Sequence, residues 1–206
     1  MPTVILASSH PRILASSTGT GIQVAPANDT LSILLQGDVI ASAHDRAIRT
    51  DSANDADVSI AGTVIARSNG TYLNTATGSD TLVTIQPTGT VLTHDNTAVA
   101  VSGDNALIRN FGFASSGGTG VAVFDDGAIV ENYGSITPTS TDGTFGAAIT
   151  TASSGINDLV IRNFGVLSST DPAQAAVITS DAVGVVTLMN AGEITSGGLA
   201  VLDGGG

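Results

Sequence analysis

The sequence predicts an all-β fold: a single-stranded, right-handed parallel β-helix of about seven to eight coils. A sequence motif of two short apolar strands separated by Asn-x-Gly recurs along the chain, most clearly between Asp158 and Ser169. The apolar runs are short, β-branched and divided by Gly, Asn or Asp, which argues against helical periodicity. The 25 glycines and the absence of Trp suit thin layers of strands joined by tight turns.

The spacing between the glycines of this motif gives the length of the repeat. An apolar strand follows each glycine, and a third apolar patch, such as residues 98–101, closes each unit. Successive glycines lie 22 to 31 residues apart, which excludes the six-residue period of left-handed hexapeptide helices, and the Leu-x-x-Leu-x-Leu spacing of leucine-rich repeats is missing. The three apolar patches of each unit predict three strands in each coil, and the spacing of parallel strands predicts a stack about 35 Å long. The glycines are Gly37, Gly62, Gly89, Gly112, Gly134, Gly165 and Gly192.

The repeats predict one domain spanning residues 1–206. Residues 1–27 form an N-terminal partial or capping coil in this prediction, and the Gly-rich residues 204–206 are a candidate start of a following segment. Core strands cannot change length without losing register, so extra residues belong in turns. We therefore expect the longest interval to place a protruding loop within residues 137–145 or 152–157, where such folds often carry function.

An Asn precedes the glycine by two residues in the last four units. Stacked one strand spacing apart, these amides can hydrogen-bond along the helix axis as an asparagine ladder, and Asn tolerates the left-handed backbone of a sharp corner. The earlier units hold Leu35, Ile60 and Pro87 there, so the ladder is confined to the C-terminal half. We expect a structural role, with ligand binding as the alternative. The four are Asn110, Asn132, Asn163 and Asn190.

A series of Asp residues comes just before the first strand of the units. They could cap the turns between coils through their own backbone amides. They could instead form a column of carboxylates whose mutual repulsion is relieved by bound Ca²⁺. The series is Asp29, Asp55, Asp80, Asp104, Asp126, Asp158 and Asp181, with Asp203 ending the last unit.

Two turns carry residues that suit acid–base chemistry. His44-Asp45 and His94-Asp95 occupy equivalent turns two units apart, and Arg67 lies in the turn between them. Stacking aligns these side chains on one side of the helix. Acid–base groups beside an Arg could lyse or hydrolyse an acidic sugar chain, although short polar turns also carry such residues by chance. Gly-x-Ser-x-Gly, Walker and His-Glu-x-x-His motifs are absent from the sequence.

Composition narrows the range of partners. The formal net charge of −12 argues against nucleic acid, which is bound mainly by basic contacts to phosphate, and against anionic membranes. It favours divalent cations. With no Cys, disulfides and thiolate metal sites are excluded. No apolar run reaches about 18 residues, so no membrane insertion is expected, and the first residues lack the features of a classical signal peptide.

The repeated units carry a resemblance to known proteins. Over residues 28–203, the Asn-x-Gly-x-Ile units with their Ala-Ile-type patches resemble the β-helical passenger segments of large bacterial secreted proteins. These include autotransporter-like adhesins and the leading regions of repeats-in-toxin (RTX) proteins. Residues 201–206 resemble the beginning of a Gly-Gly-x-Gly-x-Asp calcium nonapeptide array. The resemblance implies bound Ca²⁺, export through a C-terminal signal and an extracellular or cell-surface location.

These features favour a non-catalytic secreted stalk or adhesion module within a larger protein, with a cell-surface glycan or protein as its partner. The alternative is a carbohydrate-active β-helix (polysaccharide lyase, hydrolase or epimerase) with its site near His44, Arg67 and His94. Such enzymes usually line their grooves with aromatic platforms, whereas most of the seven aromatic residues here lie at positions that predict core packing. A trimeric phage or tail-fibre element is a third interpretation.

Overall fold

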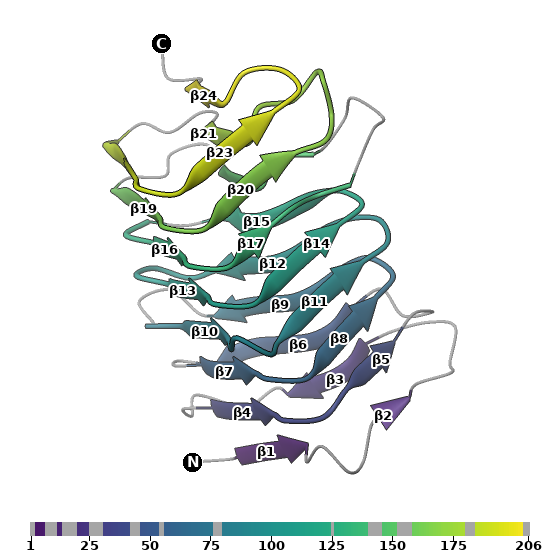
Figure 1. Cartoon of the computed structure of the whole chain (residues 1–206). Helices are drawn as coiled ribbons and strands as arrows, with labels where there is room; N and C mark the ends of the chain where they lie inside the picture. Colours follow the sequence, from purple (N-terminus) through teal and green to yellow (C-terminus); the bar gives the residue numbers. More distant parts are fainter. Residues whose placement is uncertain are drawn as a thin grey trace.

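The computed structural model describes residues 3–6, 12–13, 20–24, 31–41, 46–53, 56–75, 80–124, 126–139, 146–151, 158–179 and 184–203. Every element in these ranges is a β-strand, and the strands form three parallel sheets of eight strands each (Figure 1). The predicted all-β parallel β-helix is confirmed. Within the same ranges, no helix is long and apolar enough to span a bilayer.

Each coil contributes one strand to each sheet. Sheet A contains β1 (Thr3–Leu6), β4 (Leu31–Leu35), β7 (Ala56–Ile60), β10 (Leu82–Ile85), β13 (Leu107–Asn110), β16 (Ile129–Asn132), β19 (Leu159–Asn163) and β22 (Val186–Asn190). Sheet B contains β2 (Arg12–Ile13), β5 (Val39–Ala41), β8 (Thr63–Ala66), β11 (Thr90–Thr93), β14 (Phe113–Ser116), β17 (Ser135–Ile136), β20 (Val166–Ser169) and β23 (Glu193–Ser196). Sheet C contains β3 (Thr20–Val24), β6 (Arg46–Ala53), β9 (Asn69–Thr75), β12 (Thr97–Ser102), β15 (Thr119–Val123), β18 (Ile149–Thr151), β21 (Val177–Thr179) and β24 (Val201–Asp203).

The coil is right-handed. In Figure 1 the chain runs along sheets A and B at the front, returns along sheet C behind them, and rises toward the C-terminus. Each strand therefore pairs with the strand three elements later, as β10 does with β13.

The core consists of rows of the same kind of side chain. In sheet A, parallel pairing places one inward residue directly above the next, and the six members of this row from β4 to β19 are fully buried. A shift of one residue would turn the whole row outward, so the register is strongly specified. The row is Ile33, Val58, Val83, Ile108, Val130 and Ile161.

The corner between sheets A and B requires glycine. A Cβ atom on Gly134 would lie 2.1 Å from the carbonyl oxygen of Gly112, and one on Gly165 would lie 2.1 Å from that of Gly134. Contacts this short are sterically forbidden, so each coil can seat on the one below only if this position has no side chain. This close approach explains why glycine marks the repeat.

The asparagine ladder is confirmed beside this corner. The side-chain Nδ2 atoms of Asn110, Asn132 and Asn163 each donate to the Oδ1 atom of the next Asn, at 2.8, 2.8 and 2.7 Å. These three residues are fully buried. The same amides also donate to the backbone carbonyls of Ser135, Val166 and Glu193 in the coil above, at 3.0 to 3.1 Å.

The ladder position in the unit marked by Gly89 differs from the sequence prediction. Ile85, not Pro87, pairs with Asn110 and continues the row upward from Leu35 and Ile60. The turn between β10 and β11 is two residues longer than the equivalent turn between β13 and β14. Counting back from Gly89 therefore reached a turn residue instead of the end of the strand.

The three corners differ in how much they vary. Two residues separate the strands at the A–B corner in five of the coils, whereas the B–C corner ranges from two residues to the twelve between β17 and β18. The seven residues between β18 and β19 are also part of the longest interval. Extra length thus lies between strands, as expected, although residues 140–145 and 152–157 of the predicted loops are outside the described ranges. Sheet C is bordered on both sides by corners of variable length.

Candidate functional site

The structure brings together three of the residues predicted to carry acid–base chemistry. Thr93, at the end of β11, pairs with Ala66, at the end of β8, so the turns that follow lie one above the other. Arg67 Nε donates to Asp95 Oδ2 at 3.3 Å, and His94 Nδ1 contacts Asp95 Oδ1. The remaining two predicted residues, His44 and Asp45, lie outside the described ranges.

This cluster is solvent-exposed. The side chains of Arg67, His94 and Asp95 are 61%, 85% and 47% exposed. The pKa of Asp95 lies below its ordinary value, chiefly because His94 hydrogen-bonds to the carboxylate, with Arg67 adding to the effect. Catalytic acids and bases are more often shifted toward neutral pH by burial. A depression of about 460 Å³ lies beside the cluster; it is lined by Ile65, Ala66, Arg67, Leu92, Thr93 and His94.

The acidic series divides into two registers where it is described. Counting back two residues from the paired Leu82, Leu107, Ile129 and Val160 places Asp80, Asn105, Gly127 and Asp158 in one column. Asn105, Gly127 and Asp158 share a left-handed backbone, with φ of 59°, 71° and 60°, which Asn, Asp and Gly adopt in tight turns. Asp104 and Asp126 occupy the preceding column.

Only Asp104 and Asp126 among these residues therefore lie at equivalent positions in adjacent coils. The strand β24 places Asp203 opposite Thr179, while Asp29, Asp55 and Asp181 lie outside the described ranges. In the part of the chain that the structure describes, no group of three or more His, Asp or Glu side chains could hold a metal ion. Calcium binding by the series stays a prediction.

The aromatic residues correct the sequence analysis. Phe111, Phe113, Tyr133 and Phe164 are 38% to 49% exposed, so the expectation of core packing was wrong for them. Phe111, Tyr133 and Phe164 each follow a buried ladder Asn by one residue, at the first position of the A–B corner, and their side chains are exposed. Their rings form a column along the axis, with centroids 4.9 and 5.0 Å apart and planes within 10° of parallel.

A row of charges runs beside the aromatic column. Glu131 accepts hydrogen bonds from Arg109 Nε at 2.9 Å and Arg162 Nη1 at 2.8 Å. The Glu131 side chain is 11% exposed, whereas those of the two arginines are 42% and 39% exposed. The pKa of Glu131 is lowered, first by the hydrogen bond from Arg109 and then by Arg162, against the opposing effect of partial burial.

We call these six residues the aromatic–arginine face: Phe111, Tyr133, Phe164, Arg109, Glu131 and Arg162. Its formal charge is +1 on a chain whose net charge is −12. The exposed Met189 extends it toward the C-terminus, because Met189 pairs with Arg162. The sequence did contain a signal for this face: an aromatic residue directly after the Asn in three successive units.

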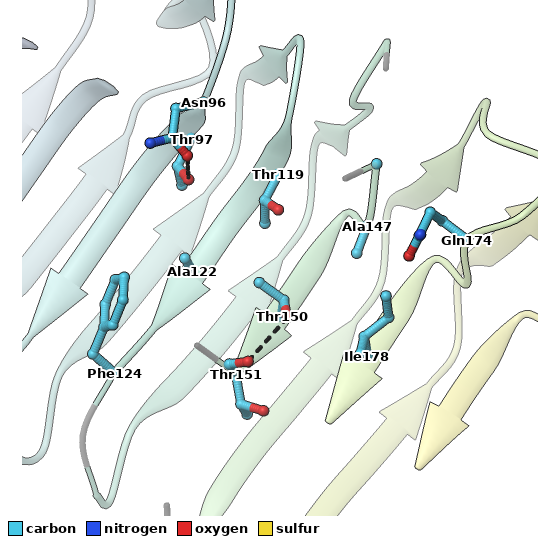
Figure 2. A pocket seen from close by; sticks show the side chains of 11 residues that line it. Asn96, Thr97, Thr119, Ala122, Phe124, Ala147, Thr150, Thr151, Gln174 and Ile178 are labelled. Atoms are coloured by element: carbon cyan, nitrogen blue, oxygen red, sulfur yellow. Dashed lines mark hydrogen bonds between the residues drawn. The ribbon is translucent and has the colours of Figure 1, made fainter. Parts of the chain in front are cut away.

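A groove lies on the outer side of sheet C, across β12, β15, β18 and β21 (Figure 2). Its volume is about 490 Å³, within the usual range for small-ligand sites. Hydroxyl, amide and apolar side chains line it, and none of the lining residues that the structure describes is charged. They are Asn96, Thr97, Thr119, Ala122, Phe124, Gly146, Ala147, Thr150, Thr151, Gln174 and Ile178. Sequence analysis did not find this groove.

Comparison of the chain with protein-family models, curated proteins and solved structures finds no match. The fold is thus established by the strand pairing, and the candidate sites by their own geometry.

Proposed function

We propose that the chain is a non-catalytic, secreted β-helical stalk and adhesion module of a larger bacterial extracellular protein. The aromatic–arginine face is the observation that carries this proposal. Aromatic and Arg side chains supply much of the energy at protein interfaces, and here three stacked rings and two arginines lie on the outside of the molecule. A cell-surface glycan or protein is the partner that such a face suits.

The scaffold beneath this face supports a binding role. The stacked Asn110, Asn132 and Asn163 side chains fix the corner from within, and the next residue of each coil carries an aromatic ring. A surface that is already ordered loses little conformational entropy when it binds. The neighbouring ion pairs of Glu131 hold Arg109 and Arg162 in place as well.

Cell-binding measurements test the adhesive function. The triple variant Phe111→Ser, Tyr133→Ser and Phe164→Ser should bind whole cells at least about tenfold more weakly than the parent chain, because aromatic anchors dominate interface energy. The control triple variant Thr63→Ala, Thr90→Ala and Thr187→Ala changes outward positions elsewhere and should bind normally. Fluorescently labelled chain and flow cytometry provide the readout, with melting temperatures to confirm folding. Equal binding by the two triple variants would refute the role of this face.

Calcium belongs to this proposal as a separate component. Millimolar Ca²⁺ should raise the melting temperature relative to Mg²⁺ or EDTA, because a bound cation relieves repulsion between carboxylates. The double variant Asp104→Asn and Asp126→Asn should reduce that rise, whereas Asp57→Asn, an exposed substitution on β7, should not. An unchanged melting temperature would remove calcium and leave the adhesive function standing.

The second candidate is a carbohydrate-active enzyme. It is favoured by the contacts of Asp95 with Arg67 and His94 beside a surface depression. Incubation with a polyuronate, followed by assays for reducing ends and for unsaturated products, tests it. The adhesive proposal predicts no depolymerisation. Activity that disappears in His44→Ala or His94→Ala would establish the enzyme instead.

A further inference from the structure

We propose that the groove on sheet C binds a neutral saccharide. The groove lies on a different sheet from the aromatic–arginine face. The proposal rests on the proposed adhesive function, because it names a class of ligand that an adhesion module would bind. It depends on four properties of the groove: its regular strand scaffold, its hydrogen-bonding groups, its apolar surface and its lack of charge among the described lining residues.

The groove is built on paired strands. Thr97 and Thr119 occupy the same position in the adjacent strands β12 and β15. Farther along the strands, Ala122, Thr150 and Ile178 form an outward row across β15, β18 and β21. Polar and apolar side chains thus recur at the strand spacing of about 4.8 Å. This regularity suits a ligand that itself presents repeated hydroxyl groups.

The hydroxyl groups keep capacity for a ligand. Thr97 Oγ1 donates to Asn96 Oδ1 at 3.1 Å, and Thr150 Oγ1 donates to the carbonyl of Thr151 at 3.1 Å. Their oxygen lone pairs therefore remain acceptors for sugar hydroxyls. Thr119 is 5% exposed, and it lines the groove. The Thr119 hydroxyl can donate to and accept from a sugar hydroxyl in the groove.

The apolar part of the lining suits the C–H faces of sugar rings. Phe124 offers an aromatic ring at one side with Ala122 near it, and Ile178 adds an aliphatic side chain on the other side of Thr150 (Figure 2). Sites for small ligands typically combine such an apolar lining with a few polar groups that fix orientation. A site with these properties can recognise a molecule whose polar edge and apolar face lie close together.

Charge selects a neutral ligand over an acidic one. The described lining contains no Arg, Lys or His to pair with a carboxylate or sulfate, and the chain as a whole carries −12. The field of such a chain repels anions. The position of the groove also suits ligand recognition. Sheet C is bordered by the corners whose lengths differ from coil to coil, and binding residues are often carried by such loops.

Binding measurements with purified polysaccharides test the inference. The full chain would be examined by affinity electrophoresis and calorimetry against soluble β-glucan, mannan and galactan, with polygalacturonate as the acidic counterpart. We expect binding to at least one neutral polymer and none to polygalacturonate. Thr119→Val keeps the shape of the side chain but removes the hydroxyl, and it should weaken binding about fivefold, the effect of one hydrogen bond.

Two substitutions at Phe124 examine the apolar contact. Phe124→Tyr keeps the ring and should preserve binding, whereas Phe124→Leu removes the ring without emptying its site and should weaken binding at least about fivefold. Thr90→Val, on the outer side of sheet B, is the matched control for Thr119→Val and should bind like the parent chain. Melting temperatures confirm that each variant is folded.

The outcomes separate this inference from the proposed function. Absence of binding to every neutral polymer, preference for polygalacturonate, or binding unchanged by both Thr119→Val and Phe124→Leu would overturn the groove proposal. Cell binding that depends on the aromatic–arginine face would then still support adhesion. Conversely, polysaccharide binding that depends on Thr119 and Phe124, without any cell binding, would support the groove and refute adhesion.

Discussion

Replacing Asn132 by Ala tests how much the asparagine ladder stabilises the helix. The Asn132 side chain accepts from Asn110 at 2.8 Å and donates to Asn163 Oδ1 at 2.8 Å and to the Val166 carbonyl at 3.0 Å. Substitution removes all three hydrogen bonds in a fully buried setting. Asn110 Nδ2 keeps its bond to the Ser135 carbonyl, but Asn163 Oδ1 and the Val166 carbonyl lose an interaction that water cannot easily replace.

The expected cost follows from these contacts. A hydrogen bond contributes about 1 kcal/mol net, and a buried group left unpaired costs about 1–3 kcal/mol. Asn132→Ala should therefore lower the free energy of unfolding by about 3–5 kcal/mol. Asn190→Ala is the matched control at the end of the same ladder. Asn190 is exposed, and Asn163 Nδ2 retains the Glu193 carbonyl, so this change should cost only about 1 kcal/mol.

Urea unfolding followed by circular dichroism measures both variants. A third variant, with Asn110, Asn132 and Asn163 all replaced by Leu, adopts the chemistry that Leu35, Ile60 and Ile85 already provide in the earlier coils. Removing donors and acceptors together leaves fewer unpaired groups, so the triple change should cost much less than three times Asn132→Ala. Equal effects of Asn132→Ala and Asn190→Ala would refute this account of the ladder.

Two further predictions concern the same corner. Glu131→Gln should lower stability at pH 7 by about 2 kcal/mol, since hydrogen bonds to charged groups are the stronger ones. Because the folded-state pKa of Glu131 lies below its ordinary value of 4.5, its contribution is present above that value and disappears as pH falls through the folded-state pKa. Thermal melts of the parent and Glu131→Gln chains should therefore converge in acid, and a constant difference would contradict the ion-pair explanation. Gly134→Ala should destabilise the chain by at least about 2 kcal/mol in urea unfolding, because its Cβ would meet the Gly112 carbonyl; Ser135→Ala is the control, and similar losses in both would count against the steric requirement.

The fold could be predicted because each coil contacts an equivalent part of the next. Gly112 recurs as Gly134 since each would otherwise collide with the carbonyl below it, and Asn110 recurs as Asn132 since each bonds to the other. Such contacts require the same type of residue at the equivalent position of each coil. The periodicity of the sequence therefore follows directly from the stacking of the coils.

The same reasoning failed where the spacing changed within a turn. The two extra residues between Ile85 and Gly89 moved the predicted ladder position onto Pro87. In the acidic series, Asp104 and Asp158 both precede a strand, but they differ by one residue in register. A difference of one or two residues is invisible in a degenerate repeat, and it decides which side chains meet.

The groove could not be predicted for a different reason. Its residues are spread from Asn96 to Ile178 and share no motif, because it lies across four strands and the turns beside them. The outward direction of Phe111 and Tyr133 was predictable in principle from their place next to the buried Asn residues. Their apolar character favoured the core, but they lie at the corner directly after the buried Asn, where the side chain is exposed.

The glycine corner also restricts how this chain can change over evolution. Gly112, Gly134 and Gly165 leave no room for a side chain, and the connection at this corner is two residues long in five of the coils. The other two corners, which both border sheet C, accept longer connections, up to the twelve residues between β17 and β18. Insertions and deletions are therefore expected mainly at the edges of sheet C. The surface there can diversify while the core strands of the β-helix keep their register. For an engineer, the B–C corner between β17 and β18 is accordingly the place to graft a foreign loop.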